Sequence, residues 1–283
     1  MSTTRTRSDR CPGVRRPWPA DDGLLVRLRL VGGRLPVASL VALLEVAEEY
    51  GDGRVHVTGR ANLQLRGLPG RDGALPQAVV SRIEATGLLP SRSHELVRNI
   101  LVSPASGVAG GRADLRPVAA ALDVAVRETA VLSGLSGRFL FVLDDGRGDL
   151  VGRSCDLGLV ALDAASAQLR IGTAWGDVVP LDHAAGLLAG LASGFVGRRG
   201  HGETAAWHVA ELPEPLAPGC APDPRLPAAT GPLAFGRVPG GRHVEVPAAG
   251  LDRRTAMALL TGAGPEVVVT PWHGIFVADG GAR

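Results

Sequence analysis

The sequence predicts an α+β fold in which two related α+β units surround a mixed α/β domain. Strand-like and helix-like segments alternate over residues 21–90, a pattern typical of an α+β unit. A stretch with seven prolines, residues 211–232, then interrupts the pattern. After it, residues 233–283 repeat features of the first unit, so duplication is the simplest interpretation. The central domain is expected over residues 91–210.

The composition of the 283-residue chain excludes several classes of function. Hydrophobic residues make up 45% of the chain, enough for a sizeable core. All 30 basic residues are arginines, which excludes lysine Schiff-base chemistry, pyridoxal-phosphate anchoring and a P-loop lysine. A net charge of +2 without a basic, aromatic-rich run argues against nucleic acid as a partner. No apolar stretch approaches the ~20 residues of a membrane span, so no membrane partner is expected.

The N-terminal residues and the cysteines predict an intracellular protein. Residues 1–20 carry five arginines within the first 16 positions but no apolar segment of the signal-peptide type, which indicates a flexible leader. The three cysteines, Cys11, Cys155 and Cys220, lie far apart and show no metal-binding or disulfide spacing. A reducing, cytoplasmic location follows as the expectation.

The first unit is predicted to contain two strands and two helices. Residues 37–50 place Leu40, Leu43, Leu44 and Ala47 on one face at helical spacing, and Gly51 ends the helix. The other elements are expected at residues 24–31 (strand), 54–67 (strand) and 75–86 (helix). This order resembles a ferredoxin-like half.

The central domain is predicted to be a mixed α/β structure. Its expected elements are a helix at 116–132, a strand at 138–144, short strands at 158–162 and 168–172, a helix at 181–196 and a shorter helix at 203–209. The proline-rich residues 211–232 are interpreted as an extended linker to the second unit.

The second unit can be laid over the first. Residues 236–260 predict a strand, a glycine turn, a second strand and a helix. Residues 266–279 then overlay residues 54–69, so that Thr270 corresponds to Thr58 and Trp272 to Arg60.

Residues 55–67 carry the strongest functional pattern. At a strand period of two, one face is wholly polar; its members are His56, Thr58, Arg60, Asn62, Gln64 and Arg66. This face has two guanidinium groups and no acid, which suits an oxyanionic or carboxylate-rich ligand. The alternative is an ordinary solvent-facing side of an antiparallel sheet.

Two further segments supply candidate residues. Arg98 and Asn99 lie in V-R-N-I, and Arg138 begins the strand that Asp144 and Asp145 end in a turn. Such isolated motifs are also common in purely structural roles. The seven histidines are scattered, so no metal site is expected from them.

These segments together resemble the nitrite/sulfite reductase superfamily. The similar segments are HVTGRANLQLRGL (56–68), VRNILVSPASG (97–107) and GRFLFVLDD (137–145). Within the superfamily the chain is most similar to the precorrin-3B synthase branch, through CPG (11–13), DDGLLVRLRLVGGRL (21–35) and VVTPWHGIFV (268–277). The resemblance covers about residues 11–279, and it implies two ferredoxin-like units with a tetrapyrrole-binding domain between them.

The resemblance implies roles for the candidate residues. Arg60 and Arg98 would belong to the cationic surround of a tetrapyrrole, with Asn62, Gln64, Arg66, Asn99 and Arg138 as further contacts. The reductases place two lysines where this chain has Arg138 and Leu140, and the apolar Leu140 fits the precorrin branch better. The family also implies a 4Fe–4S cluster held by four cysteines, together with iron or siroheme. This sequence ends at Arg283 without such a cysteine set, so its own cofactors are left open.

Three functions are implied as alternatives. The first is a precorrin-3B synthase-like oxidoreductase that hydroxylates precorrin-3A with O₂ and forms a lactone. The second is a siroheme-type nitrite or sulfite reductase-like protein, and the third is a tetrapyrrole-binding protein or subunit without catalysis. The expected ligand is a polycarboxylate tetrapyrrole, precorrin-3A or siroheme, and a redox partner is possible. Leu140 and the TPWHG segment favour the first over the second, and the missing cysteine set favours the third.

Overall fold

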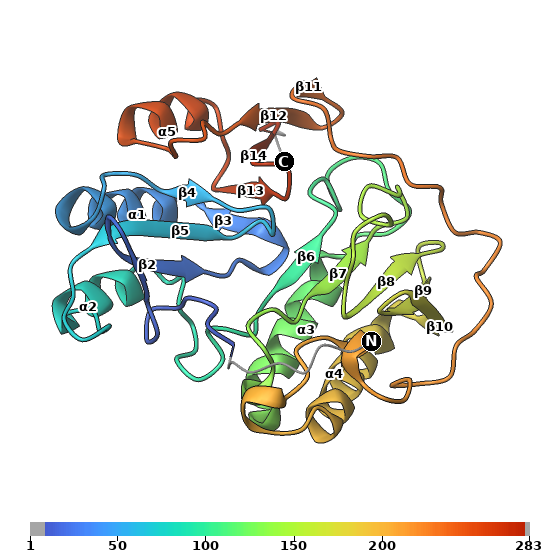
Figure 1. Ribbon diagram of the computed structural model, residues 1–283. Helices are drawn as coiled ribbons and strands as arrows, with labels where there is room; N and C mark the ends of the chain where they lie inside the picture. Colours follow the sequence, from blue (N-terminus) through green and yellow to red (C-terminus); the bar gives the residue numbers. More distant parts are fainter. Residues whose placement is uncertain (1–8, 281–283) are drawn as a thin grey trace. The chain divides into compact units, whose positions relative to one another are not determined.

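The computed structural model describes residues 9–280, and these form two compact units (Figure 1). One unit, the duplicated unit, contains Cys11–Glu95 and the chain from Leu233 onward. The other, the central unit, contains Leu96–Pro232 together with the residues just before Cys11. None of the helices within residues 9–280 combines the length and the apolar character that a bilayer crossing needs.

The duplicated unit contains two four-stranded arrangements of the same order. Its first half contains β1 (Trp18–Ala20), β2 (Gly23–Leu28), β3 (Arg34–Pro36), α1 (Val37–Tyr50), β4 (His56–Val57), β5 (Leu63–Leu68) and α2 (Gln77–Ala85). Its second half contains β11 (Gly236–Val238), β12 (Gly241–Glu245), α5 (Arg253–Leu260), β13 (Glu266–Thr270) and β14 (Gly274–Ala278). The strand orders β1-β2-β5-β4 and β11-β12-β14-β13 match, which confirms the predicted pair of ferredoxin-like units.

The two halves exchange backbone pairing in a reciprocal way. β3 of the first half extends the second sheet, where Leu35 lies opposite Val267. In return, Leu251 of the second half pairs with Val55, just before β4, through two hydrogen bonds of 2.9 Å. Such mutual pairing fits a pseudo-two-fold relationship between the halves.

Helix α1 forms as its sequence pattern predicts. Leu40, Leu43, Leu44 and Ala47 are fully buried, so the apolar stripe faces the core. The helix ends at Tyr50, and a Cβ at Gly51 would lie 2.6 Å from the carbonyl oxygen of Arg66. Glycine at this position therefore allows the chain to pass close to β5.

The single strand predicted over residues 54–67 is wrong, because the chain turns in its middle. β4 ends at Val57 and β5 starts at Leu63. Between them, the Thr58 N–H donates to the Asn62 carbonyl and the Ala61 N–H donates to the Thr58 carbonyl. Ala61 has a left-handed φ of 54°, which a continuous strand does not allow. The strict alternation therefore stops at the turn.

The N-terminal prediction also needs correction, since residues 9–20 are part of the fold. The Glu95 carboxylate accepts hydrogen bonds from the N–H groups of Val14 and Arg15, at 2.8 and 3.0 Å. Val14 is 1% exposed, and β1 pairs with β2. The arginine-rich composition of this segment indicated a flexible leader and gave no sign of these contacts. The remainder of the expected leader, residues 1–8, lies outside the described residues.

The central unit has one mixed sheet with two helices on one face (Figure 1). Its elements are β6 (Ile100–Val102), α3 (Arg116–Glu128), β7 (Phe141–Asp144), β8 (Leu157–Ala161), β9 (Ser166–Ile171), β10 (Ala174–Pro180) and α4 (Leu181–Arg198). The order is β10-β9-β8-β7-β6, in which β6, β7 and β8 are parallel. β10 was not expected from the sequence, and the helix expected at 203–209 is replaced by two 3-10 turns.

The proline-rich residues after Glu211 run along the central sheet. The Cys220 N–H donates to the Trp175 carbonyl at 2.7 Å. The Gln168 side chain donates to the Ala221 carbonyl at 2.8 Å and accepts from the Asp223 N–H at 2.8 Å. Hydrogen bonds from a buried glutamine thus hold this extended segment on its sheet, where a free linker was expected.

Candidate functional site

The predicted site residues divide between the two units. Arg60, Asn62, Gln64 and Arg66 belong to the duplicated unit, and Arg98, Asn99 and Arg138 belong to the central unit.

Arg60 lies at the tip of the β4–β5 hairpin, and Asn62 shapes that tip. Arg60 is half-buried. Asn62 is 1% exposed; its side-chain oxygen accepts the Leu30 N–H at 3.0 Å, and its own N–H donates to the Thr58 hydroxyl at 3.2 Å. Asn62 is therefore a turn residue that presents Arg60, and its contact with a ligand stays a prediction.

Gln64 and Arg66 lie on β5, after the turn. The polar face predicted around them is not free of acids in the structure, because a carboxylate contacts it. Arg66 donates to both Asp22 oxygens, at 2.9 and 3.3 Å, and this hydrogen bond lowers the pKa of the Asp22 carboxyl. Gln64 lies opposite His56 and receives a long hydrogen bond of 3.5 Å from Arg27. The alternation over residues 55–67 could not reveal Asp22, because this carboxylate belongs to the turn between β1 and β2.

A second turn tip lies beside the first. The turn between β13 and β14 contains Pro271, Trp272 and His273. A Cβ on Gly59 would lie 3.7 Å from His273 Nε2 and 4.0 Å from the Pro271 carbonyl oxygen, so the tips of the two halves are in contact range. Gly59 and Pro271, which the overlay aligns, are thus neighbours in space as well.

A cavity of about 440 Å³ opens next to these turns. His56 and Val57 at the end of β4 line one part, and Glu245, Trp272 and His273 of the second half line another. His56 Nε2 is 2.6 Å from Asp52 Oδ2. The cavity lies wholly within the duplicated unit.

In the central unit, Arg98 and Asn99 precede β6 and are buried in structural contacts. Arg98 Nε donates to Asp123 Oδ1 at 2.5 Å, and the Asp123 Oδ2 atom accepts from Arg127. The Asn99 side-chain nitrogen donates to the carbonyls of Leu96 and Gly137. Asn99 thus joins the starts of β6 and β7, and Arg98 anchors helix α3. Neither contact was expected from the V-R-N motif.

Arg138 is the exposed cation at this end of the sheet. Its guanidinium carbon lies 5.0 Å from the centre of the Trp207 ring. A cation over an indole face is attracted by the ring, so this contact helps to position the Arg138 side chain. Leu140, two residues later, is 7% exposed and points into the core. The second cationic position of the reductases is therefore an interior position in this chain.

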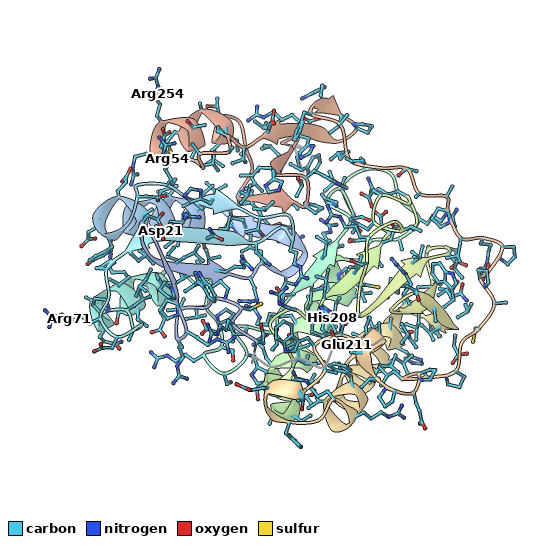
Figure 2. All side chains as sticks on the ribbon, viewed as in Figure 1. Asp21, Arg54, Arg71, His208, Glu211 and Arg254 are labelled. Atoms are coloured by element: carbon cyan, nitrogen blue, oxygen red, sulfur yellow. The ribbon has the colours of Figure 1, made fainter. Side chains whose placement is uncertain are left out.

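Sequence reasoning missed Asp156, Trp207 and His208. Asp156 is 2% exposed and accepts the N–H groups of Leu140 and Val209. His208 Nδ1 lies 3.3 Å from both Asp156 oxygens. Figure 2 labels His208 beside Glu211, whose carboxylate accepts the Trp207 N–H. The sequence offered one sign of this group, the adjacent Trp207 and His208. Asp156 is 52 residues away from His208 in sequence, so only the fold brings them together.

The amino ends of three parallel strands therefore carry this cluster. Arg98 precedes β6, Arg138 precedes β7 and Asp156 precedes β8, and parallel strands bring their amino ends to one edge.

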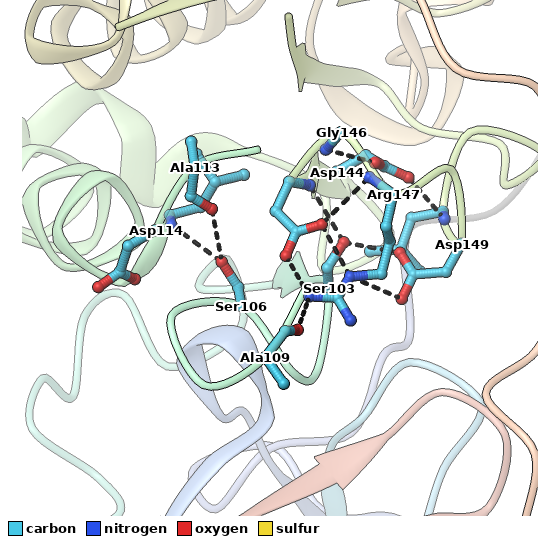
Figure 3. A network of polar contacts seen from close by, with 12 residues as sticks. Ser103, Ser106, Ala109, Ala113, Asp114, Asp144, Gly146, Arg147 and Asp149 are labelled. Atoms are coloured by element: carbon cyan, nitrogen blue, oxygen red, sulfur yellow. Dashed lines mark hydrogen bonds and ion pairs between the residues drawn. The ribbon is translucent and has the colours of Figure 1, made fainter. Parts of the chain in front are cut away.

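The opposite edge of the sheet holds a closed polar network (Figure 3). Asp144 accepts N–H groups of Gly146, Gly148 and Leu150, so its carboxylate organises the loop. Arg147 forms an ion pair of 2.6 Å with Asp145. The Ser103 hydroxyl donates to Asp149 at 2.6 Å, and burial raises the pKa of Asp149 to about 7.

The cysteines do not fit the cluster that the family implies. Cys11 is in the duplicated unit, whereas Cys155 and Cys220 are in the central unit. The Cys155 thiol interacts with the Gly172 carbonyl, and burial raises its pKa to about 11. The Cys220 thiol donates to Asp177, which raises its pKa. Within residues 9–280, no three acidic, histidine or cysteine side chains are grouped as a metal site. No reaction step is assigned to a cluster held by this chain.

Comparisons with known proteins agree with this architecture. Residues 19–73 match the nitrite/sulfite reductase ferredoxin-like half domain. A precorrin-3B synthase of Sinorhizobium sp. is 31% identical over 178 residues, and a ferredoxin–nitrite reductase of Leptolyngbya laminosa is 39% identical over 93 residues. The NirA protein of Mycobacterium tuberculosis has the same fold, with a TM-score of 0.65 at 18% identity over 95% of this chain.

The chain is much shorter than these proteins. The matched regions cover 58% and 32% of this chain, but 34% of the synthase and 18% of the nitrite reductase. The structural match covers 59% of the NirA chain. The half domain and the fold fit the nitrite/sulfite reductase superfamily and the branch expected from the sequence.

Proposed function

We propose, from the place of this chain in the nitrite/sulfite reductase superfamily, that it binds a polycarboxylate tetrapyrrole and acts on precorrin-3A as a precorrin-3B synthase-like oxidoreductase. The observation that carries the proposal is the position of Arg60. It lies at a turn tip inside the matched half domain, and a buried asparagine fixes that turn.

The charges of the candidate residues suit such a ligand. Precorrins carry several carboxylates around a macrocycle, and guanidinium groups bind carboxylates through paired hydrogen bonds. In the duplicated unit, Arg60 is the candidate for this contact, because it lies at the hairpin tip inside the matched half domain. In the central unit the candidate is Arg138, because it is exposed just before β7 and its guanidinium lies over the Trp207 ring.

The interior position of Leu140 favours precorrin-3A over a small inorganic anion. A nitrite or sulfite site gains from two converging cations, and here the second position is an apolar core residue. Asp156 and His208 lie at the same edge of the central sheet as Arg138, and they are candidates for holding or moving a proton during the reaction.

The proposed oxidation needs electrons as well as O₂. One oxygen atom enters the macrocycle and the other leaves as water, which consumes two electrons and two protons. The proposal assigns these electrons to a redox partner. A tetrapyrrole-binding subunit without catalysis is the second candidate. It is favoured because Cys11, Cys155 and Cys220 are not brought together as ligands of a redox cluster.

The test is titration with porphyrins of different carboxylate number. Uroporphyrin has eight carboxylates, coproporphyrin four and protoporphyrin two, on one macrocycle. We expect the Soret band to shift on binding and the affinity to increase with carboxylate number. Equal affinity for all three, or no binding of uroporphyrin, would contradict the proposal. Incubation with precorrin-3A, O₂ and a reductant then separates the two candidates, because only the oxidoreductase yields a product heavier by one oxygen atom.

A further inference from the structure

The cavity of the duplicated unit has a histidine held in one orientation. Asp52 Oδ2 lies 2.6 Å from His56 Nε2, so Nε2 is the donor of this hydrogen bond to the carboxylate. In the neutral ring, Nδ1 is then the hydrogen-bond acceptor. Asp52 itself is fixed, because its other oxygen accepts the Arg54 N–H at 3.0 Å.

A glycine allows a turn of the second half to approach this histidine ring closely. A Cβ at residue 250 would lie 2.9 Å from His56 Nδ1 and 3.0 Å from the neighbouring ring carbon. Gly250 has a φ of 88° and its N–H donates to the Pro247 carbonyl in a tight turn. The Gly250 turn therefore packs against the His56 ring and forms part of the cavity wall.

An indole ring forms another part of the wall. Trp272 packs edge-on against the buried His243, with 6.2 Å between ring centres. His243 is held in turn by the Thr270 hydroxyl at 2.9 Å, and burial lowers its pKa. Trp272 is thus backed by a neutral ring and stays half-buried.

The ionisable side chains that line the cavity are one carboxylate and two imidazoles. Glu245 lines the cavity and is exposed, His273 adds a second imidazole, and the remaining members are aliphatic. The lining residues include no arginine. Arg54, labelled in Figure 2, is directed to the Gly250 carbonyl and to Asp252, at 3.4 and 3.8 Å.

We propose that this cavity binds a small organic cation, such as a protonated primary amine or a guanidinium group. The Trp272 ring offers a face for the cation, Glu245 offers the opposite charge, and His56 Nδ1 accepts a hydrogen bond from it. The site is independent of tetrapyrrole binding, for which the candidate groups are arginines.

The test uses n-butylammonium as the probe, followed by the indole N–H signals of the full-length protein in a ¹H–¹⁵N spectrum. The Trp272→Phe variant assigns the Trp272 signal. We expect that signal to shift with a Kd on the order of millimolar, as befits so small a ligand. Butyrate and butanol, which share the chain but not the charge, should leave it unchanged.

Two variants locate the charge. Glu245→Gln should weaken butylammonium binding about five- to tenfold. Glu203→Gln, at an exposed glutamate of the central unit, is the matched control and should bind as wild type. Because Glu245 is exposed, its substitution should not impair folding. Trp272→Leu should abolish binding, with circular dichroism as the check on its fold.

The proposal is overturned if butylammonium leaves the Trp272 signal unmoved, if butyrate binds as well, or if Glu245→Gln binds like wild type. Binding of Zn²⁺ instead of the amine, lost in the same variant, would also overturn it. A negative result with uroporphyrin has no bearing on this outcome, so the two proposals fail separately.

Discussion

Ala61 and His273 adopt the same left-handed backbone conformation, with φ of 54° and 57°, at the corresponding position of two hairpin turns. The left-handed region costs residues with a side chain roughly 1–2 kcal/mol, and glycine avoids that cost. Both halves of the duplicated unit thus keep the same strained geometry at the tips that carry Arg60 and Trp272. Retained strain of this kind is typical of ligand-binding turns.

Ala61→Gly should increase the free energy of unfolding by roughly 0.5 kcal/mol. Relief of the left-handed strain exceeds the ~0.5–1 kcal/mol of extra chain entropy that glycine loses on folding. Ala258→Gly, on the exposed face of α5, is the matched control and should cost about 1 kcal/mol. Urea unfolding of both variants measures the difference; a loss of stability in both would show that the turn is unstrained.

Arg98→Ala should act mainly on stability. Removal of the guanidinium leaves Asp123 buried with Arg127 as its remaining cation, a change that costs on the order of 3 kcal/mol. The double variant Arg98→Ala with Asp123→Ala should recover part of that loss, because the uncompensated carboxylate is gone. Unfolding curves for all four proteins give the coupling. Full additivity would mean that the two groups do not interact.

The stability of the protein should depend on Asp149 between about pH 4 and pH 7. Burial raises the pKa of Asp149 from 3.8 to about 7. A folded-state pKa above the unfolded value favours the protonated form, so its stabilisation is complete below about pH 4 and is lost as the pH rises through 7. Asp149→Asn should be more stable than wild type at pH 8, on the order of 2 kcal/mol, with a flatter pH profile. Thermal unfolding across pH measures both curves, and parallel curves would refute this account.

Leu140→Lys should destabilise the protein rather than create a second anion-binding cation. The side chain is 7% exposed, and a buried ammonium without a partner costs several kcal/mol. Leu140→Met keeps the volume and should cost less than about 1.5 kcal/mol. A stable Leu140→Lys protein that gains nitrite affinity would show that this position faces the ligand.

Local periodicity was enough to predict most helices and the duplication. α1 has the predicted bounds because its apolar spacing repeats over fourteen residues and a glycine stops it. The overlay of Thr58 on Thr270 also holds, since each residue leads from the first strand of a hairpin into its turn.

The polar face over residues 56–66 could not be interpreted from alternation alone. A five-residue turn leaves the pattern of polar and apolar residues almost unchanged while it reverses the chain. Arg66 is paired with Asp22 and Arg98 with Asp123. Both carboxylates come from elements distant in sequence. The same holds for Asp156 and His208, so their pairing had no signal in the sequence.

The most direct test of the central claim is uroporphyrin titration of Arg60→Gln and Arg138→Gln. Each loses one charged contact to a carboxylate, so each Kd should increase about tenfold or more. Arg71→Gln and Arg198→Gln are exposed arginine controls, one from each unit, and should bind as wild type. Wild-type affinity in both Arg60→Gln and Arg138→Gln would contradict the assignment of these residues to the tetrapyrrole site.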